Sequence, residues 1–97
     1  LLLDISAPYC SICKAIESKI FNNAQVIQQQ ATVVPVKIDN PAVAHEATQQ
    51  LLKKLQVIGV PTIILIDPEH ETEIKRWGGE LYDQTGQTFI DELTRLI

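Results

Sequence analysis

The sequence has no run of basic residues and no long apolar stretch, and each absence excludes a class of protein. Eight Lys and Arg residues against twelve Asp and Glu residues give a net charge of −4, so no nucleic-acid partner is expected. The uncharged stretch Gln56–Ile66 is interrupted by Gly59 and Pro61 and is far shorter than the roughly 20 residues that span a bilayer. We therefore also expect no direct membrane insertion of this chain.

Glycine and proline are scarce, with four and five residues. Together with 45% hydrophobic and 21% charged residues, this scarcity excludes a disordered or fibrous chain. A length of 97 residues suits a single domain with a modest core. Because Leu1–Ser6 has the pattern of a strand already under way, we expect residues 1–97 to form one domain of a longer chain.

Strand-like and helix-like patterns alternate along the sequence. The β-branched and apolar runs predict strands over Leu1–Ser6, Thr32–Ile38, Thr62–Ile66 and Glu73–Trp77. Helical spacing and capping residues predict helices from Cys10, after Asn22-Asn23, over Ala42–Leu55 and from Thr85. In the third helix, apolar residues recur every four positions and are expected to face the core: Val43, Ala47, Leu51 and Leu55. The order β-α-α-β-α-β-β-α predicts an α/β domain with helices covering a mixed sheet.

Cysteine is nearly absent, and the two that occur, Cys10 and Cys13, form a C-x-x-C pair. A structural disulfide across so short a loop would stabilise by only roughly 2 kcal/mol, against about 3 kcal/mol for a fifteen-residue loop. A zinc site would need two more ligands, but there is no second C-x-x-C, and His45 and His70 lie apart on different elements. Covalent haem attachment would need His where Lys14 stands, so neither a metal nor another cofactor is expected.

Thiol–disulfide exchange is the third interpretation of the pair, and the favoured one. Cys10 would lie at a helix N-terminus, where unpaired backbone N–H groups and the helix dipole favour the nucleophilic thiolate. Cys13, one turn further on, would share its face and lie close enough to close a disulfide. Lys14 would add positive charge beside the pair.

The chain resembles the thioredoxin superfamily over nearly its whole length. The resemblance rests on the strand LLLDIS, the motif YCSICK, the strand VKID, the segment VIGVPT, and the closing hairpin and helix. Within the superfamily, CSICKAIESKIFNNAQV is most similar to the C-terminal periplasmic domain of DsbD-type thiol:disulfide interchange proteins. The resemblance implies a thioredoxin-like α/β fold, with a mixed sheet flanked by helices, that lacks the family's N-terminal strand.

The resemblance implies roles for four chemical groups. Cys10 would attack the substrate disulfide, and Cys13 would resolve the mixed disulfide. Asp4 matches the buried acid that exchanges protons with the resolving thiol. Glu17 matches a second acid near the site, although an ordinary surface Glu on a helix is the alternative.

Substrate binding is implied on the opposite side of the cysteine pair. Tyr9 stands where Trp commonly precedes the first cysteine and would form a flat rim. Pro61 resembles the family's cis-proline, and Val60 before it would pair with an extended substrate as an added strand; a Pro that merely starts a strand is the alternative. Pro35 occupies the position of a lysine that neighbours the buried acid in plain thioredoxins, and Lys37 is expected to point to the other face of the sheet.

The residues in and after the pair, Ser11, Ile12 and Lys14, are expected to tune its redox balance. They include neither the His of strong oxidants and isomerases nor the Pro of plain thioredoxins, so the thiolate lacks an imidazolium and the couple should be reducing. The resemblance implies a periplasmic reductase of protein disulfide substrates that is supplied by an upstream transmembrane electron-donor domain. A cytoplasmic location, a free-standing thioredoxin or disulfide isomerase, and a redox-silent peptide-binding module are the alternatives.

Overall fold

A four-stranded mixed sheet forms the centre of the protein in the computed structural model, which describes residues 1–41 and 44–97. Its strands, in the spatial order β2-β1-β3-β4, are β1 (Leu2–Ile5), β2 (Pro35–Ile38), β3 (Thr62–Asp67) and β4 (Thr72–Trp77). β1 is parallel to β2 and antiparallel to β3, and β3 and β4 form an antiparallel hairpin. β1 is therefore paired along both of its edges.

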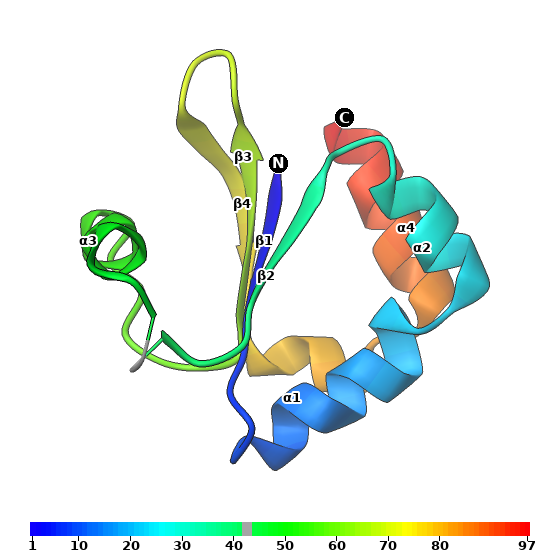
Figure 1. The fold of residues 1–97 in the computed structure, drawn as a ribbon. Coiled ribbons are helices and arrows are strands. Elements are labelled where there is room, and N and C mark those ends of the chain that lie inside the picture. The colour runs from blue at the N-terminus through cyan, green and yellow to red at the C-terminus, as the bar shows by residue number, and fades with distance from the viewer. Residues whose placement is uncertain (42–43) are drawn as a thin grey trace.

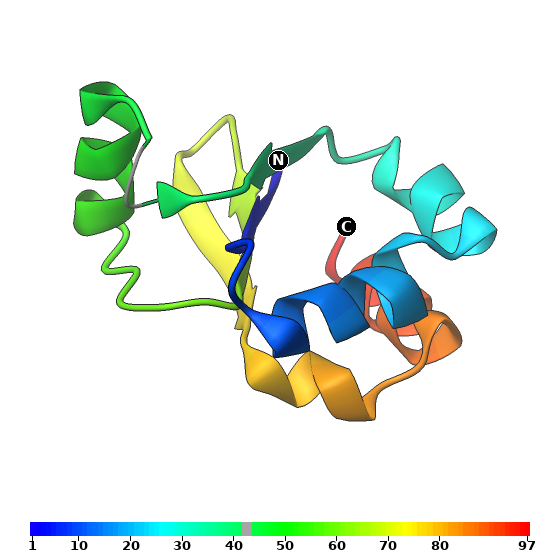
Figure 2. The ribbon, with the colours of Figure 1, turned by 60° about the horizontal axis from the view of Figure 1, so that its bottom comes forward.

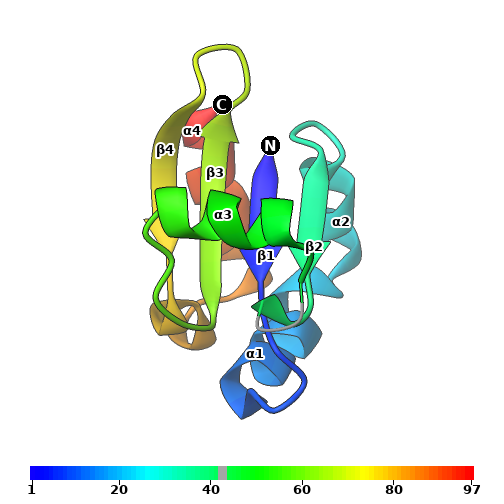
Figure 3. The ribbon, with the colours of Figure 1, turned by 60° about the vertical axis from the view of Figure 1, so that its left-hand side comes forward.

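Helices lie on both faces of the sheet (Figure 1). One face carries α1 (Ser11–Ile16), the π-helical turn η1 (Glu17–Phe21), α2 (Ala24–Gln30), the 3-10 turn η3 (Gly79–Asp83) and α4 (Gly86–Leu96). The other face carries α3 (Glu46–Lys54), which runs across the strands (Figure 3). The predicted mixed sheet with flanking helices is thus confirmed.

None of the helices in the described part of the chain has the length and apolar character needed to cross a membrane.

Two cores form because successive side chains of a strand point to opposite faces of the sheet. The larger core lies against α1, α2 and α4 and includes Leu2, Ile63, Leu65 and Trp77 from the strands with Ile16, Ile20, Val26, Phe89 and Leu93 from the helices. The smaller core lies under α3 and consists of Leu3, Ile5, Leu52 and Ile64. Because side chains on both faces of β1 and β3 are buried, the sequences of these two strands are nearly continuous runs of apolar residues.

Two predicted helix starts are confirmed by their capping bonds. The Asn23 side chain accepts hydrogen bonds from the backbone N–H groups of Gln25 and Val26, at 2.9 and 3.4 Å, and so caps α2. The Thr85 hydroxyl accepts from the N–H of Thr88 at 3.1 Å and caps α4. Each cap satisfies donors that lack an intrahelical partner.

The second strand is shorter than the predicted Thr32–Ile38. It begins at Pro35, because Val34 has a positive φ of 50° that breaks the extended backbone. β-branched composition alone could not reveal this turn, since Val34 itself favours extended structure.

The third helix differs from the predicted Ala42–Leu55 in its start and in its buried face. It begins at Glu46, after His45 as N-cap, while residues 42 and 43, and with them the predicted position of Val43, lie outside the described residues. Leu52 is the buried residue of α3, whereas Leu51 is 42% exposed. Of the predicted face, Leu55 packs against the smaller core as expected, but Ala47 and Leu51 are exposed. Leu51 was predicted in place of Leu52 because both are apolar and periodicity alone does not choose between them.

Removing the Phe89 ring should destabilise the larger core strongly. Phe89 is fully buried, with its ring centroid 5.5 Å from that of Phe21 and 5.3 Å from that of Trp77. We expect Phe89→Ala to lower the free energy of unfolding by about 3–5 kcal/mol in urea denaturation, because it removes apolar contacts and leaves a cavity. Ile97→Ala, at a residue 56% exposed, is the control and should change stability by about 0.5 kcal/mol or less. A similar small loss for both variants would contradict this assignment of the core.

Candidate active site

Cys10 and Cys13 are joined by a disulfide at the start of α1. Figure 2 shows how the chain passes from β1 into this helix. Their Cα atoms are 5.2 Å apart, within the usual range for a disulfide. Cys10 is the N-cap residue of α1, and its Sγ accepts a hydrogen bond of 3.1 Å from the backbone N–H of Cys13. Cys10 is half-buried and Cys13 is only 7% exposed, so a partner molecule reaches Cys10 first.

A tight turn delivers Cys10 to this position. The backbone N–H of Ser6 donates to the carbonyl of Ile38 at 2.9 Å, which holds the end of β1 against β2. The N–H of Cys10 then donates to the carbonyl of Ala7 at 3.1 Å, closing a turn with Pro8 as its second residue. Pro is favoured at that position because its fixed φ suits the turn. The sequence APYC therefore fixes where the disulfide lies relative to the sheet.

Lys37 lies on the same face of the sheet as Asp4, so the expectation that it points to the other face was wrong. Asp4 of β1 and Lys37 of β2 are paired in the parallel ladder. The Lys37 Nζ lies 3.4 Å from an oxygen of Glu17 and 3.6 Å from an oxygen of Asp39. The period of two in a strand could have revealed this, because Lys37 follows Pro35 by two residues and must share its face.

Glu17 and Lys37 line two cavities, one of which also includes the buried cysteine and the other Asp4. A surface cavity of about 450 Å³ is lined by Cys13, Lys14, Glu17 and Lys37, among others. A neighbouring cavity of about 260 Å³ is lined by Asp4 together with Glu17 and Lys37. Because the two cavities share Glu17 and Lys37, these side chains connect Asp4 to the surroundings of Cys13.

The acid and lysine charges influence one another at this place. Burial, the largest cause, and the Glu17 carboxylate together raise the pKa of Asp4 to about 6, although the Lys37 ammonium partly opposes the shift. Burial lowers the pKa of Lys37, but the Glu17 and Asp39 carboxylates outweigh it, so that the pKa lies above its usual value. Lys37 therefore remains charged near neutral pH, whereas Asp4 changes its protonation state not far below neutral pH.

Tyr9 and Val60 line a second groove beside the disulfide, on the side of α3. Tyr9 is 76% exposed, and the groove of about 470 Å³ also includes Leu52, Ile58 and Gly59. The peptide bond between Val60 and Pro61 is cis, as the resemblance implied. Within the described part of the chain, the backbone N–H and C=O of Val60 have no hydrogen-bond partner. The groove thus presents free backbone polar groups beside apolar side chains.

The remaining predicted residues lie at the exposed start of α1. Ser11, Ile12 and Lys14 are all exposed. Ile12 is 47% exposed and does not continue the buried face formed by Ile16 and Ile20. Its exposure beside the disulfide places an apolar side chain next to any bound partner.

Potential metal ligands gather at the other end of the sheet. The oxygen and nitrogen ligand atoms of Asp67, Glu69 and His70 lie within 4.8 Å of one another in the turn between β3 and β4. His70 Nδ1 is 2.8 Å from Asp67 Oδ2, and this bond is the largest cause of the lowered pKa of Asp67. The turn and α1 lie at opposite ends of the molecule (Figure 1), so this group has no part in the chemistry of the cysteines.

The comparisons with known sequences give a consistent result. Residues 1–94 match the family model of the thioredoxin-like domain. The chain is 38% identical over 96 residues to the thiol:disulfide interchange protein DsbD of Haemophilus ducreyi, covering 98% of this chain and 16% of that protein. It is 30% identical over 96 residues to DsbD of Pasteurella multocida, again covering 98% of this chain and 16% of the relative. The chain thus spans about one sixth of the length of these relatives.

Solved structures show the same fold at lower sequence identity. The C-terminal domain of Neisseria meningitidis DsbD in the oxidised form matches with a TM-score of 0.79 at 21% identity, covering 100% of this chain and 79% of that chain. The DsbH oxidoreductase matches with a TM-score of 0.82 at 19% identity, covering 98% of this chain and 69% of that chain. These matches confirm the expected thioredoxin-like fold.

Neutralising Asp4 should stabilise the oxidised protein above pH 6. Because the pKa of Asp4 is about 6 in the folded protein, the folded state binds more protons than the unfolded state between about pH 4 and pH 6. Stability therefore falls as pH rises through this window, by up to about 3 kcal/mol. We expect Asp4→Asn to raise the free energy of unfolding at pH 8 by about 1–3 kcal/mol and to leave it nearly unchanged at pH 3, as measured by urea denaturation across this pH range.

The exposed Asp91 of α4 provides the matched control for this experiment. Asp91→Asn makes the same chemical change outside the site and should keep the fall in stability between pH 4 and pH 6. If Asp4→Asn kept that fall as well, the titration would belong to another group.

Proposed function

Because the chain belongs to the thioredoxin-like family, we propose that it is a thiol–disulfide oxidoreductase that reduces disulfides in partner proteins. The observation that carries this proposal is the disulfide itself. Its accessible residue, Cys10, caps a helix, while Cys13 is buried beside a cavity that is also lined by Glu17 and Lys37. A structural staple would not need one accessible sulfur or ionisable groups beside the other. The arrangement suits a cysteine pair that alternates between the dithiol and the disulfide form.

The reaction transfers two electrons and two protons. The Cys10 thiolate of the reduced pair attacks one sulfur of the substrate disulfide and releases the other as a thiolate. Cys13 then gives up its proton, and its thiolate attacks Cys10 Sγ, which closes the disulfide seen here and releases the second substrate sulfur as a thiolate. The two substrate thiolates take up one proton each to become thiols. In this way the substrate disulfide is reduced and the Cys10–Cys13 pair is oxidised.

Helix α1 favours the thiolate that begins the reaction. The N–H of Cys13, which donates to Cys10 Sγ at 3.1 Å in the disulfide form, can donate to the thiolate as well. The helix dipole acts in the same direction, because Cys10 lies at the N-terminal end. Both interactions select Cys10 as the nucleophile.

Proton transfer to and from Cys13 is assigned to Asp4, with Glu17 and Lys37 between them. A pKa of about 6 allows Asp4 to accept and release a proton near neutral pH. Glu17 lines the cavities of both Cys13 and Asp4, so it lies on the path between them. Lys37 holds Glu17 by an ion pair of 3.4 Å.

An extended segment of the partner protein would bind beside Val60. The unpaired N–H and C=O of Val60 can pair with such a segment as an added strand, which supplies affinity without reading a particular sequence. Exposed Tyr9 and Ile12 offer apolar contacts to side chains on either side of the substrate disulfide. The expected substrates are therefore protein disulfides in exposed, extended segments.

We assign the direction of electron flow to reduction. The thiolate of the reduced form has no histidine between the cysteines to stabilise it, and Asp4 and Glu17 add negative charge nearby. A less stabilised reduced state corresponds to a more reducing couple. The similarity to DsbD proteins supports a periplasmic location and a membrane-embedded electron donor for this domain.

Trapping the mixed disulfide tests the reaction. In Cys13→Ser the resolving thiol is lost, so Cys10 should remain bound to a protein substrate such as insulin, as a product stable on non-reducing gels. Cys10→Ser should form no such product, because Cys13 is buried. If neither variant forms an adduct and the wild type reduces no protein disulfide, the oxidoreductase assignment fails and a redox-silent binding module remains.

The direction is tested by equilibration against glutathione buffers. We expect a reduction potential closer to roughly −270 mV, as in thioredoxin, than to roughly −120 mV, as in strong oxidants. Ile12→His should raise the potential by about 30 mV or more, because an imidazolium beside the pair stabilises the thiolate. Ile27→His on α2, also at an exposed position, is the control and should leave it unchanged. A wild-type potential near that of the strong oxidants would overturn the assignment of a reductase.

A further inference from the structure

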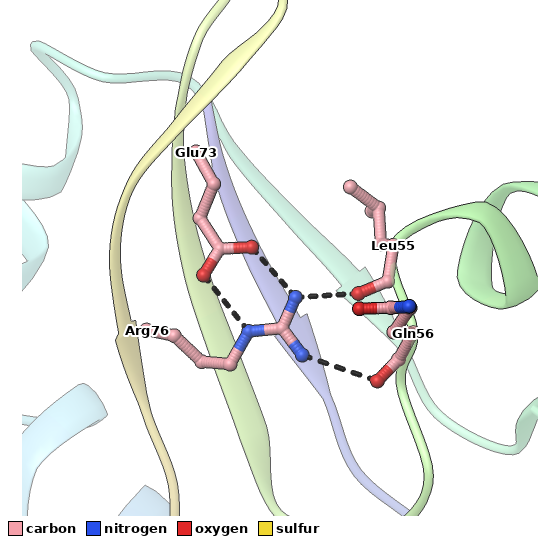
Figure 4. A network of polar contacts seen from close by, with 4 residues as sticks. All are labelled: Leu55, Gln56, Glu73 and Arg76. Atoms are coloured by element: carbon pink, nitrogen blue, oxygen red, sulfur yellow. Dashed lines mark hydrogen bonds and ion pairs between the residues drawn. The ribbon is translucent and has the colours of Figure 1, made fainter.

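Arg76 of β4 joins the sheet to the C-terminal end of α3 (Figure 4). Its Nη2 donates to the carbonyl of Leu55 at 2.5 Å, and its Nη1 donates to the carbonyl of Gln56 at 3.3 Å. The Glu73 carboxylate orients the guanidinium by accepting from Nε at 3.0 Å and from Nη2 at 2.6 Å. The guanidinium makes these four bonds from three nitrogens in one plane, whereas a lysine ammonium has one nitrogen with three donors and cannot reproduce this geometry.

The two carbonyls lie where α3 ends in an unusual conformation. Gln56 has a positive φ of 58°, a conformation that glycine adopts more readily. The N–H groups of Gln56 and Val57 donate to the carbonyls of Lys53 and Leu52, at 3.0 and 2.9 Å, in the paired pattern of a Schellman motif. The positive charge of Arg76 also suits the negative end of the helix dipole. Arg76 therefore stabilises a helix end that its own sequence favours weakly.

The segment that follows this helix end is the one that carries Val60. Ile58 is fully exposed, and Val57 and Val60 only partly join the smaller core. At the far end of the segment, the Thr62 hydroxyl donates to the carbonyl of Gly59 at 2.7 Å. Arg76 holds the near end, so the segment 56–60 is fixed from both sides.

We propose that Arg76 is a positioning residue for substrate recognition, because its guanidinium holds the segment 56–60 in the shape that presents the Val60 backbone to a polypeptide. The inference rests on the proposed function. Arg76 takes no part in electron transfer, since it lies on β4 and bonds to α3 and Glu73 rather than to either cysteine. Its loss should therefore weaken the use of protein disulfides that pair with Val60, and not the use of small disulfides that react at Cys10 without such pairing.

Kinetics with two substrates test the proposal: steady-state reduction of insulin with dithiothreitol as the electron source, and a single turnover of the pre-reduced protein, freed of dithiothreitol, with dithiobis(nitrobenzoic acid). For Arg76→Gln we expect the KM for insulin to rise roughly tenfold, because the pairing segment is displaced, with kcat unchanged. The single-turnover rate with the small disulfide and the reduction potential against glutathione should stay at the wild-type values. Arg76→Lys should also raise the KM for insulin, because it keeps the charge but not the fork.

Lys75→Ala provides the matched control. Lys75 precedes Arg76 in the same strand but points to the other face, where its Nζ lies 3.6 Å from Glu92. This variant should leave the KM for insulin and the rate with the small disulfide unchanged. An unchanged KM for insulin in Arg76→Gln would overturn the proposal, and so would an equal loss of activity with both substrates, which would indicate a merely structural role.

Hydrogen exchange keeps the proposal testable if Arg76→Gln does not fold. In folded Arg76→Lys, the amides of Gln56 and Val57, which donate to the carbonyls of Lys53 and Leu52, should exchange faster than in the wild type, while those of β1 keep their protection. Unchanged exchange at Gln56 and Val57 would overturn the proposal. A wild type that reduces neither substrate would instead contradict the proposed function and leave the structural role of Arg76 to the exchange experiment.

Discussion

The burial of β1 on both faces, with strand partners on both edges, is the constraint on which the rest of the structure depends. Leu2 faces the larger core, and Leu3 and Ile5 face the smaller one. A strand held in this way has a fixed end, so the short turn after it delivers Cys10 to one place at the start of α1. The same strand carries Asp4 toward Glu17 and Lys37. The reactive disulfide and the acid that is proposed to serve it are thus placed by one element.

The ionised form of Asp4 lowers the stability of the folded protein, and the burial of apolar side chains in the two cores must offset this loss. Burial and the nearby Glu17 carboxylate make an ionised Asp4 unfavourable, and Lys37 relieves only part of this. Such a cost suits a group that must change its protonation state during a reaction, since a fully paired carboxylate would not titrate near neutral pH. The substrate side is organised differently, because a cationic side chain and a helix end hold the segment leading to Val60. Chemistry and recognition therefore depend on separate interactions on opposite faces of the sheet.

Local signals in the sequence predicted much of this arrangement. Asn23 and Thr85 cap helices because their side chains reach backbone donors within the next three residues, and such contacts are readable from the sequence. The side chains of Leu51 and Lys37 were placed wrongly for different reasons. At Leu51 the periodicity was ambiguous, since Leu52 is also apolar, and only packing against Leu3 and Ile64 selects Leu52. For Lys37 the sequence was sufficient, because residues two apart in a strand lie on the same face and Lys37 follows Pro35 by two. The prediction placed the two residues on opposite faces.

The sequence by itself determined the C-x-x-C pair at the start of a helix, the acid six residues before it, the proline beyond the third helix, and the order of strands and helices. These features depend on neighbours a few residues apart or on the alternation of apolar residues. Only the tertiary structure decided that Glu17 and Lys37 meet beside Asp4, and that Arg76 reaches the carbonyls at the end of α3 across twenty positions of sequence. Such contacts follow from strand order and register, which bring distant residues together and which short-range patterns do not encode.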